Sequence, residues 1–529
     1  MTRIKHYLLL LSILLLSLTS CSKDEAYKEA LPADATMVCT FDIKTLSEKA
    51  GLSSDKNNPL RQRITALIGD SYQDLFLNIK KSGIDLSSPI YLFATEQVEL
   101  GYLLRLDDAD KLEESFNQLR KLNGEDSTPL KEEDGIFIDI DEETSESEEM
   151  SFSDEGFATP TPPQTTKHLA LYAFNDKAFI SLNSSKATAE ELKQLAKKYL
   201  TQQKEASYTA TAAFRDLEAQ KGDIRGALSL QFFSTPGYAQ LLPARFAQLA
   251  SAATEGIDTK KCYMLYALSF ETGEVVGTMT YGATEQAQLE RLKKRTADLS
   301  PESIQDGLIK LLPRDGYLTA AMTLDAPKFV QYYGQLPFLQ ELKSKGVNLD
   351  AVAASLGKEI TLSLFSIDVE HLDLGVIGYL KSRDASLVDA IYQQAATEGK
   401  PHIKEGEHRY RFADAPISYG YANGLTYVRS GKSGQIELGA SPSEDFTKHA
   451  TYATLKPNNS FVYIDLKKLL TTSPTADLLQ VILSEQTKNT LLPLHSLSIT
   501  SSGIESQLHL KLDTKENALK ALIPIFTAL

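Results

Sequence analysis

LPADATMVCTFDI (residues 31–43) is the stretch that decides the fold, because its opening motif returns near the middle of the chain as LPRDG (residues 312–316). Both copies lead into runs of alternating apolar and polar residues, Met37–Ile43 and Tyr317–Leu324. This alternation is typical of a half-buried β-strand. Recurrence at this distance indicates that the chain contains two related halves.

The same order of elements follows each copy. A helix, two adjacent strands, a second helix and a hairpin can be traced in both halves, and Asn-Asp or Asn-Gly closes the hairpin because these residues tolerate positive φ. The adjacent strands are Ile90–Ala94 with Glu99–Leu106, and Ile360–Phe365 with Leu374–Lys381. A shorter β-α-β-β-α copy ends each half. We therefore predict an α+β fold of tandem duplicated halves, each made of two ferredoxin-like (split βαβ) units. Their antiparallel sheets should be covered by helices on one face and wetter on the other.

Domain boundaries follow from this pattern. A signal peptide is predicted at residues 1–20 and a tether at 21–30. The long and short units of the first half should span 31–182 and 183–300, and those of the second half 301–440 and 441–529. Residues 141–166 are rich in acids, Ser, Thr and Pro, so we expect a disordered insertion there, since such a stretch buries little apolar area. The alternative is a protruding acidic arm that binds cations or a partner.

The first residues have the layout of a secretion signal. Arg3 and Lys5 precede an apolar run, Leu8–Leu18, which ends at Leu18-Thr19-Ser20-Cys21. The run is shorter than the roughly 20 apolar residues that a membrane span needs. LTSC resembles the bacterial lipoprotein lipobox, in which the cysteine is acylated and becomes the new N-terminus. The resemblance implies that Cys21 is a lipidation site and that a lipid anchor holds the body on a membrane.

Ser22-Lys23-Asp24-Glu25 follows the lipobox cysteine. It is similar to the signal with which Bacteroidetes lipoproteins reach the outer face of the outer membrane. We therefore expect an outer-membrane lipoprotein that is exposed at the cell surface. The alternative is an ordinary charged linker, with the protein on the periplasm-facing leaflet.

Composition narrows the choice of partners. With 55 basic and 70 acidic residues the formal net charge is −15, which argues against nucleic acid, a ligand that requires a basic footprint. The charge also argues against electrostatic binding to anionic lipid. The chain has no Trp, so a carbohydrate platform would have to use its 23 Tyr. Cys39 and Cys262 lie in strand-like runs, where we expect small buried residues, with a disulfide as the alternative.

No catalytic, cofactor-binding or metal-ligating residue is predicted. His402 and His408 are six positions apart and lack the spacing of a zinc motif. Gly431-Lys432-Ser433 lacks the first glycine of a P-loop, since Thr426 takes that position. Asp108 and Asp384 precede helices, as N-caps do. Asp126-Ser127-Thr128 is similar to the O-glycosylation pattern of Bacteroidetes envelope proteins.

Four features together resemble an uncharacterised Bacteroidetes lipoprotein family, a domain-of-unknown-function group of about 500 residues. They are the lipobox, LPADATMVCTFDIKTLSEKAG (31–51), GYLLRLDDADKLEE (101–114) and the second LPxD motif. The resemblance implies location and repeat architecture and transfers no site. We expect a non-enzymatic binding or scaffold lipoprotein with an unknown envelope protein or ligand as partner. The alternative is an envelope hydrolase with an unrecognised acidic site.

Overall fold

A computed structural model describes most of the chain, and its contacts divide the chain into two compact units. Unit 1 comprises Met1–Ser229, Leu265–Ser269 and Leu522–Thr527, and unit 2 comprises Leu230–Met264, Phe270–Ala521 and Ala528–Leu529. Two elements have residues in both units: β12 (Cys262–Glu271) and α20 (Ala518–Ala528). The described residues are 25–52, 58, 82–122, 130–147, 150–152, 158–160, 164–234, 252–368, 373–430, 438–473, 475–477 and 484–528.

Unit 1 is built on an antiparallel sheet in which β1 is central. On one side β1 pairs with β11, and on the other the order continues through β3, β4, β10, β9, β6 and β5, with the short β2 beside the end of β4. The strands are β1 (Met37–Phe41), β2 (Ile84–Asp85), β3 (Ile90–Ala94), β4 (Leu100–Leu106), β5 (Lys131–Glu133), β6 (Ile136–Ser147), β9 (Gln164–Phe174), β10 (Ala178–Ser184) and β11 (Ile224–Ser229).

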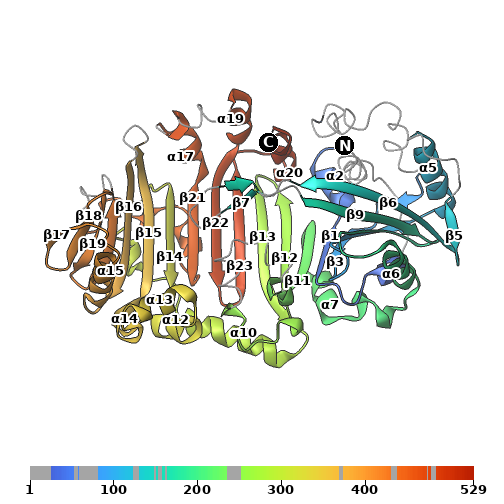
Figure 1. The fold of residues 1–529 in the computed structure, drawn as a ribbon. Helices are drawn as coiled ribbons and strands as arrows, with labels where there is room; N and C mark the ends of the chain where they lie inside the picture. The colour runs from blue at the N-terminus through green and yellow to red at the C-terminus, as the bar shows by residue number, and fades with distance from the viewer. Residues whose placement is uncertain are drawn as a thin grey trace. The chain divides into compact units, whose positions relative to one another are not determined.

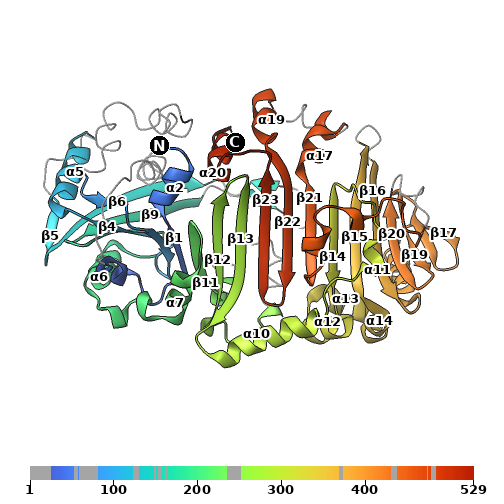
Figure 2. The same cartoon turned by 180° about the vertical axis from the view of Figure 1, so that it is seen from behind.

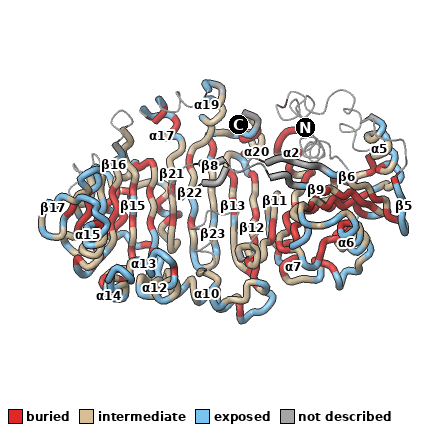
Figure 3. Tube along the Cα trace, viewed as in Figure 1, coloured by how far each residue is buried: buried red, intermediate tan, exposed pale blue. Residues whose placement is uncertain are grey.

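The helices of unit 1 begin where capping side chains follow a strand or turn. Asp42 caps α2 directly after β1, and Thr188 and Glu191 form a capping box at the start of α6. The buried residues lie mainly along the strands (Figure 3). The helices are α2 (Ile43–Lys49), α5 (Ala109–Leu122), α6 (Ala189–Thr201) and α7 (Ala212–Ala219), with the 3₁₀ turns η1 (Ala26–Ala30), η3 (Lys204–Ala206) and η4 (Tyr208–Ala210).

Unit 2 repeats this strand order around β14. β14 pairs with β21 and β15, and the order continues from β15 through β16, β20, β19, β18 and β17, and from β21 through β22, β23 and β13 (Figure 1). The strands are β13 (Glu274–Ala283), β14 (Leu318–Thr323), β15 (Leu356–Asp368), β16 (Asp373–Ser382), β17 (His402–Gly406), β18 (Arg409–Phe412), β19 (Ile417–Ala422), β20 (Leu425–Ser430), β21 (Ser460–Asp465), β22 (Leu494–Ser502) and β23 (Glu505–Leu512).

Some of the helices of unit 2 also begin at a capping side chain. Asp325 caps α12 after β14, and Asp465 caps α17 at the end of β21. The helices are α10 (Gln286–Leu299), α11 (Asp306–Ile309), α12 (Ala326–Tyr333), α13 (Pro337–Ser344), α14 (Leu349–Ser355), α15 (Ser386–Thr397), α16 (Tyr452–Leu455), α17 (Leu466–Thr471) and α19 (Glu485–Leu491). The 3₁₀ turns are η5 (Leu230–Ser234), η6 (Thr259–Lys261) and η8 (Phe446–Lys448). No helix among the described residues has the length and apolar character to cross a membrane.

The pairing of β1 differs from the predicted ferredoxin-like units. A split βαβ unit keeps its first two long strands apart and places another strand between them. Here β1 pairs directly with β3, in antiparallel register from Met37–Ala94 to Phe41–Ile90, and β14 pairs with β15 in the same way. The order of the elements along the chain was predicted. That order does not determine which strand pairs with each central strand, because pairing depends on contacts between residues far apart in the sequence. The mixed α+β class and the antiparallel sheets are as predicted.

Each LPxD motif docks on a short 3₁₀ turn that arrives much later in the chain. The Tyr208 N–H donates to the Leu31 carbonyl at 3.0 Å, and the Phe446 N–H donates to the Leu312 carbonyl at 3.0 Å. Both aromatic side chains are buried. The next residues also form isolated bridges, Pro32 with Ser207 and Pro313 with Asp445. We call this pairing the LPxD clip; it occurs once in each unit.

One face of the unit 2 sheet packs against helices, as predicted, and the opposite face, which was predicted to be wetter, carries several exposed apolar side chains. The covered face packs Ala321, Ile377 and Phe461 against α11, η8 and α16, seen from behind in Figure 2. On the open face, Leu362, Val428 and Ile499 lie in one apolar row and are each nearly 40% exposed, whereas a neighbouring row contains four Ser and Thr residues. Alternation along a strand separates two faces but does not say which face helices will cover. The open face consists of Leu318, Ala320, Met322, Ile360, Leu362, Leu364, Val376, Gly378, Leu380, Thr426, Val428, Ser460, Val462, Ile464, Leu497, Ile499, Ser501, Ser506, Leu508 and Leu510.

The predicted insertion at 141–166 contains regular structure. β6 and β9 continue into it in one unbroken register from Asp141–Ala170 to Ser147–Gln164. β7 (Met150–Phe152) and β8 (Ala158–Pro160) form a separate two-stranded sheet. Thr, which is enriched in strands, occurs in both β6 and β9 here, and Lys167 forms an ion pair with Glu142 at 2.8 Å. The other residues of this stretch lie outside the described part of the chain.

Candidate functional site: the N-terminal clasp

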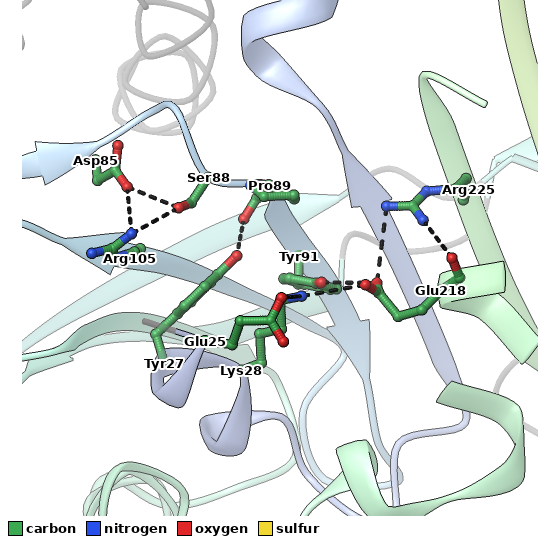
Figure 4. Close-up of polar contacts among 10 residues, drawn as sticks. All are labelled: Glu25, Tyr27, Lys28, Asp85, Ser88, Pro89, Tyr91, Arg105, Glu218 and Arg225. Carbon is green, nitrogen blue, oxygen red and sulfur yellow. Dashed lines mark hydrogen bonds and ion pairs between the residues drawn. The ribbon is translucent and has the colours of Figure 1, made fainter. Parts of the chain in front are cut away.

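The first described segment of the chain, Glu25–Leu31, is bound tightly to unit 1. Residues 26–30 form η1, in which Tyr27 and Ala30 are buried, and Leu31 is fully buried. The predicted tether, residues 21–30, is therefore shorter than expected, because its second half packs on the fold. We call the contacts of Glu25–Leu31 with unit 1 the N-terminal clasp (Figure 4).

Lys28 is the charged centre of the clasp. Its residue exposure is only 7%, and its ammonium group lies 3.3 Å from a carboxylate oxygen of Glu25 and 3.3 Å from one of Glu218. Glu218, on α7, also accepts a hydrogen bond from the Tyr91 hydroxyl at 3.1 Å. Arg225 on β11 donates to the Glu218 carbonyl at 3.4 Å. A nearly buried ammonium needs such partners, since an unpaired charge in this position would be strongly destabilising.

Tyr27 forms the second contact of the clasp. Its hydroxyl donates to the Pro89 carbonyl at 2.8 Å, and its ring centroid lies 6.1 Å from that of Tyr91. Burial raises the pKa of both tyrosines, and the carboxylate of Glu218 raises each pKa further. Both phenols therefore remain neutral hydrogen-bond donors well above physiological pH.

A second ion pair fixes the loop that receives Tyr27. Arg105 on β4 lies 3.2 Å from a carboxylate oxygen of Asp85 and donates to Ser88 at 3.4 Å. Asp85 in turn accepts from the Ser87 N–H at 2.8 Å. Ser88, which accepts from Arg105, directly precedes Pro89 in the chain, so these contacts help to position the carbonyl that Tyr27 reaches (Figure 4).

The end of α6 provides the third contact. The Gln202 side-chain amide donates to the carbonyls of Glu29 at 2.6 Å and Leu31 at 2.9 Å. A cavity of about 240 Å³ lies beside this contact. It is lined by Ala26, Tyr27, Glu29, Ala30, Asn175, Lys177, Ala178, Tyr199, Leu200, Thr201, Gln202 and Gln203. The clasp thus joins η1 to β3, the end of α6 and α7.

The residues singled out in the sequence do not form a site. His402 lies on β17, where its Nδ1 is 2.9 Å from the Lys400 carbonyl, and His408 lies in the following turn, 2.8 Å from the Asp389 carboxylate. The described residues contain no cluster of His, Cys, Asp and Glu suited to a metal ion. Asp108 accepts from the Lys111 N–H at 3.1 Å, which confirms its capping role. The capping prediction is wrong for Asp384: it accepts from the Ser386 N–H, but Ala385 is the N-cap of α15 and no side chain caps that helix.

Both cysteines of the body are buried free thiols. Burial raises the pKa of Cys39, and it raises the pKa of Cys262 to about 11, so neither is poised as a nucleophile. Cys21, Asp126-Ser127-Thr128 and Gly431-Lys432-Ser433 lie outside the described residues.

The clasp was not predicted from the sequence, although a comparison of the two halves of the sequence indicates it. Counted back from the LPxD motifs, Tyr27 and Lys28 correspond to Leu308 and Ile309. Those two residues are buried in α11 of unit 2. The comparison would have predicted burial for residues 27–28 in place of a solvated tether.

The fold and the clasp define a two-unit α+β protein of antiparallel sheets with a docked N-terminal segment. The chain belongs to the family described as Domain of unknown function (DUF4836), whose model matches residues 27–519. The matched region begins within the clasp and includes both LPxD motifs. No curated protein and no solved structure matches the chain.

Proposed function

We propose that this protein is a lipid-anchored cell-envelope protein of the outer membrane that binds or scaffolds a partner without catalysing a reaction. The observation that carries the proposal is the clasp, which fixes the chain to unit 1 from Glu25 onward. Four residue steps separate Cys21 from Glu25, so a lipid on Cys21 would lie within about 14 Å of the clasp. A segment that docks directly after the lipobox would hold the proposed lipid close to unit 1.

The chemistry of the clasp favours a scaffold over a hydrolase. Glu218 forms an ion pair with Lys28 of η1 and accepts a hydrogen bond from Tyr91, and these contacts hold η1 in place. Groups used in this way are not available to act as acid and base on a substrate. The proposed partner is an envelope protein or ligand, and the strongly acidic composition supports neither nucleic acid nor anionic lipid as the partner.

We also propose that the two halves arose by tandem duplication. The matched strand order around β1 and β14 and the occurrence of an LPxD clip in each unit support this origin. The proposal predicts that, across family members, equivalent positions of the two halves will show related residue preferences. Unrelated preferences at the clip positions would contradict it.

The anchor is tested at Cys21. Cys21→Ala should convert a membrane-associated protein into a precursor or soluble form, because no acyl chain can be attached. Fractionation of cells and mass spectrometry of the N-terminal peptide measure this. Membrane association that persists in Cys21→Ala, or an N-terminal peptide of unmodified mass in the parent protein, would contradict the proposal.

A further inference from the structure

The end of α6 and α7 cover the same face of the unit 1 sheet as η1 does. On this face the Tyr91 ring lies 6.1 Å from that of Tyr27 in η1 and 6.4 Å from that of Phe214 in α7. Two positions along the same strand, Phe93 contacts Tyr199 of α6, and alternate residues of a strand lie on one face. We call η1 together with residues 198–221, which contain the end of α6, η3, η4 and α7, the clasp layer.

Helix α5 lies on the opposite face of the sheet. Its Phe116 ring lies 6.0 Å from that of Phe179 on β10. The register places Ile180, the next residue of β10, beside Leu103, and it places Leu103 beside Tyr91. Since neighbours along a strand point to opposite faces, Phe179 and Tyr91 lie on opposite sides of the sheet. Figure 1 and Figure 2 both show α5 on one side of the strands of unit 1 and α6 and α7 on the other.

The described chain begins in the clasp layer. The Glu25 carboxylate lies 3.3 Å from the Lys28 ammonium, which lies 3.3 Å from the carboxylate of Glu218 on α7. Because a helix with its side chains is about 10–12 Å across, the outer sides of α7 and α5 are more than about 20 Å apart. The four residue steps from Cys21 to Glu25 reach at most about 14 Å. A lipid on Cys21 would therefore reach a membrane beside the clasp layer, and the link is too short to reach one beside α5.

The exposed charges of the clasp layer differ in sign from the net charge of the chain, which is −15. Residues 198–221 include four exposed cations and two exposed anions, and the cations still outnumber the anions when the exposed Glu25 is counted. None of the four cations forms an ion pair with another residue in the described part of the chain. A membrane surface that carries lipid phosphates therefore repels this layer less than it repels an acidic surface. The cations are Lys198, Lys204, Arg215 and Lys221, and the anions are Glu205 and Asp216.

We propose that the clasp layer is the membrane-facing surface of unit 1 and lies against lipid headgroups, with α5 turned away from them, a placement that rests on the proposed lipid anchor at Cys21. The anchor supplies the attachment. The clasp supplies the orientation, because it fixes the point on unit 1 at which the short link begins. The cations provide no attachment of their own in so acidic a chain, but they allow lipid phosphates to approach this layer.

The test uses the full lipidated chain in phosphatidylcholine vesicles that contain a headgroup-spin-labelled phosphatidylcholine as quencher. A thiol-reactive fluorophore is attached at Ala219→Cys, beside Glu218 on α7, or at Gln118→Cys on α5, and both positions are exposed. Labelling of the unsubstituted chain gives the background, which the buried thiols of Cys39 and Cys262 keep low. The fluorophore at position 219 should lose most of its emission and the one at position 118 should keep most of it, because the spin label lies in the headgroup layer.

A longer link provides the matched control. A Gly-Ser linker of about 12 residues, inserted after Asp24, extends the reach by up to about 40 Å. Quenching at positions 219 and 118 should then become similar, because the clasp layer is no longer held at the membrane. A difference in quenching that the linker leaves unchanged would overturn the proposed orientation.

Mass spectrometry of the N-terminal peptide separates this placement from the anchor on which it rests. If Cys21 is acylated and quenching is equal at the two positions, or stronger at 118, the clasp layer is not the membrane-facing surface and the anchor still stands. A Cys21 that carries no acyl chain in cells would overturn the anchor and the placement together.

Discussion

At the residue scale, the segment that precedes the LPxD motif is buried in both units, but the buried side chains differ in chemistry. Unit 2 buries Leu308 and Ile309 ahead of its LPxD motif, whereas unit 1 buries Tyr27 and Lys28 at the corresponding positions. An ammonium in that place is stable only with its carboxylate partners present. The N-terminal segment is therefore held by contacts that require a defined geometry as well as burial.

Lys28→Met is expected to weaken the clasp by about 1–3 kcal/mol, because it removes a nearly buried ion pair and leaves Glu218 without its ammonium partner. Hydrogen exchange over residues 25–31 should become roughly 5- to 150-fold faster, the range that this free energy implies. Lys204→Met, at an exposed residue of η3, is the matched control. Equal exchange rates in both variants would exclude a clasp role for Lys28.

Alkaline pH is expected to destabilise unit 1 through its buried tyrosines. Burial raises the pKa of Tyr91 in the folded chain above its unfolded value of about 10. The stabilising contribution is complete below that pH and is lost as the pH rises above it. Tyr91→Phe should thus be slightly less stable at neutral pH, since it loses the bond to Glu218, and should lose less stability on going above about pH 10. Urea unfolding at a series of pH values measures both effects; a slope identical to that of the parent would refute the assignment.

At the element scale, most strands were predictable and their partners were not. Ile90–Ala94 was predicted with the bounds that the structure gives it, because alternation and turn residues are local signals. The pairing of β1 with β3 and with β11 joins segments far apart in sequence, and no local pattern encodes it. The same limit explains the clasp, since Lys28 meets Glu218 across 190 positions.

The LPxD clips are expected to contribute equally to the two units. Tyr208→Ala and Phe446→Ala each remove a buried aromatic ring and should each cost about 3–5 kcal/mol. Phe338→Ala removes an exposed ring and should have little effect. Limited proteolysis, with cleavage sites mapped by mass spectrometry, would assign the loss to one unit. Loss confined to unit 1 in both variants would show that the clips are not equivalent.

At the scale of the whole molecule, the proposed anchor and the acidic composition suit a body that stays close to a membrane without adhering to it electrostatically. The family match extends over nearly the whole body and gives no activity. The location on the membrane therefore becomes the most useful property to measure.

Protease treatment of intact cells is expected to remove the body if the protein lies on the outer face of the outer membrane, as the Ser22–Glu25 segment predicts. An immunoblot against residues of unit 2 gives the measurement, with a periplasmic protein as the control for cell integrity. Full protection, under conditions that remove known surface proteins, would place the body on the periplasm-facing leaflet.

The clasp also imposes an order of events on a chain that is synthesised from its N-terminus. η1 cannot dock until Gln202, Tyr208 and Glu218 have emerged, because those residues form its binding surface. During that interval the segment around Cys21 remains accessible to the enzymes that would acylate it. Because 190 positions separate Lys28 from Glu218, acylation of Cys21 would precede the folding step in which η1 docks on unit 1.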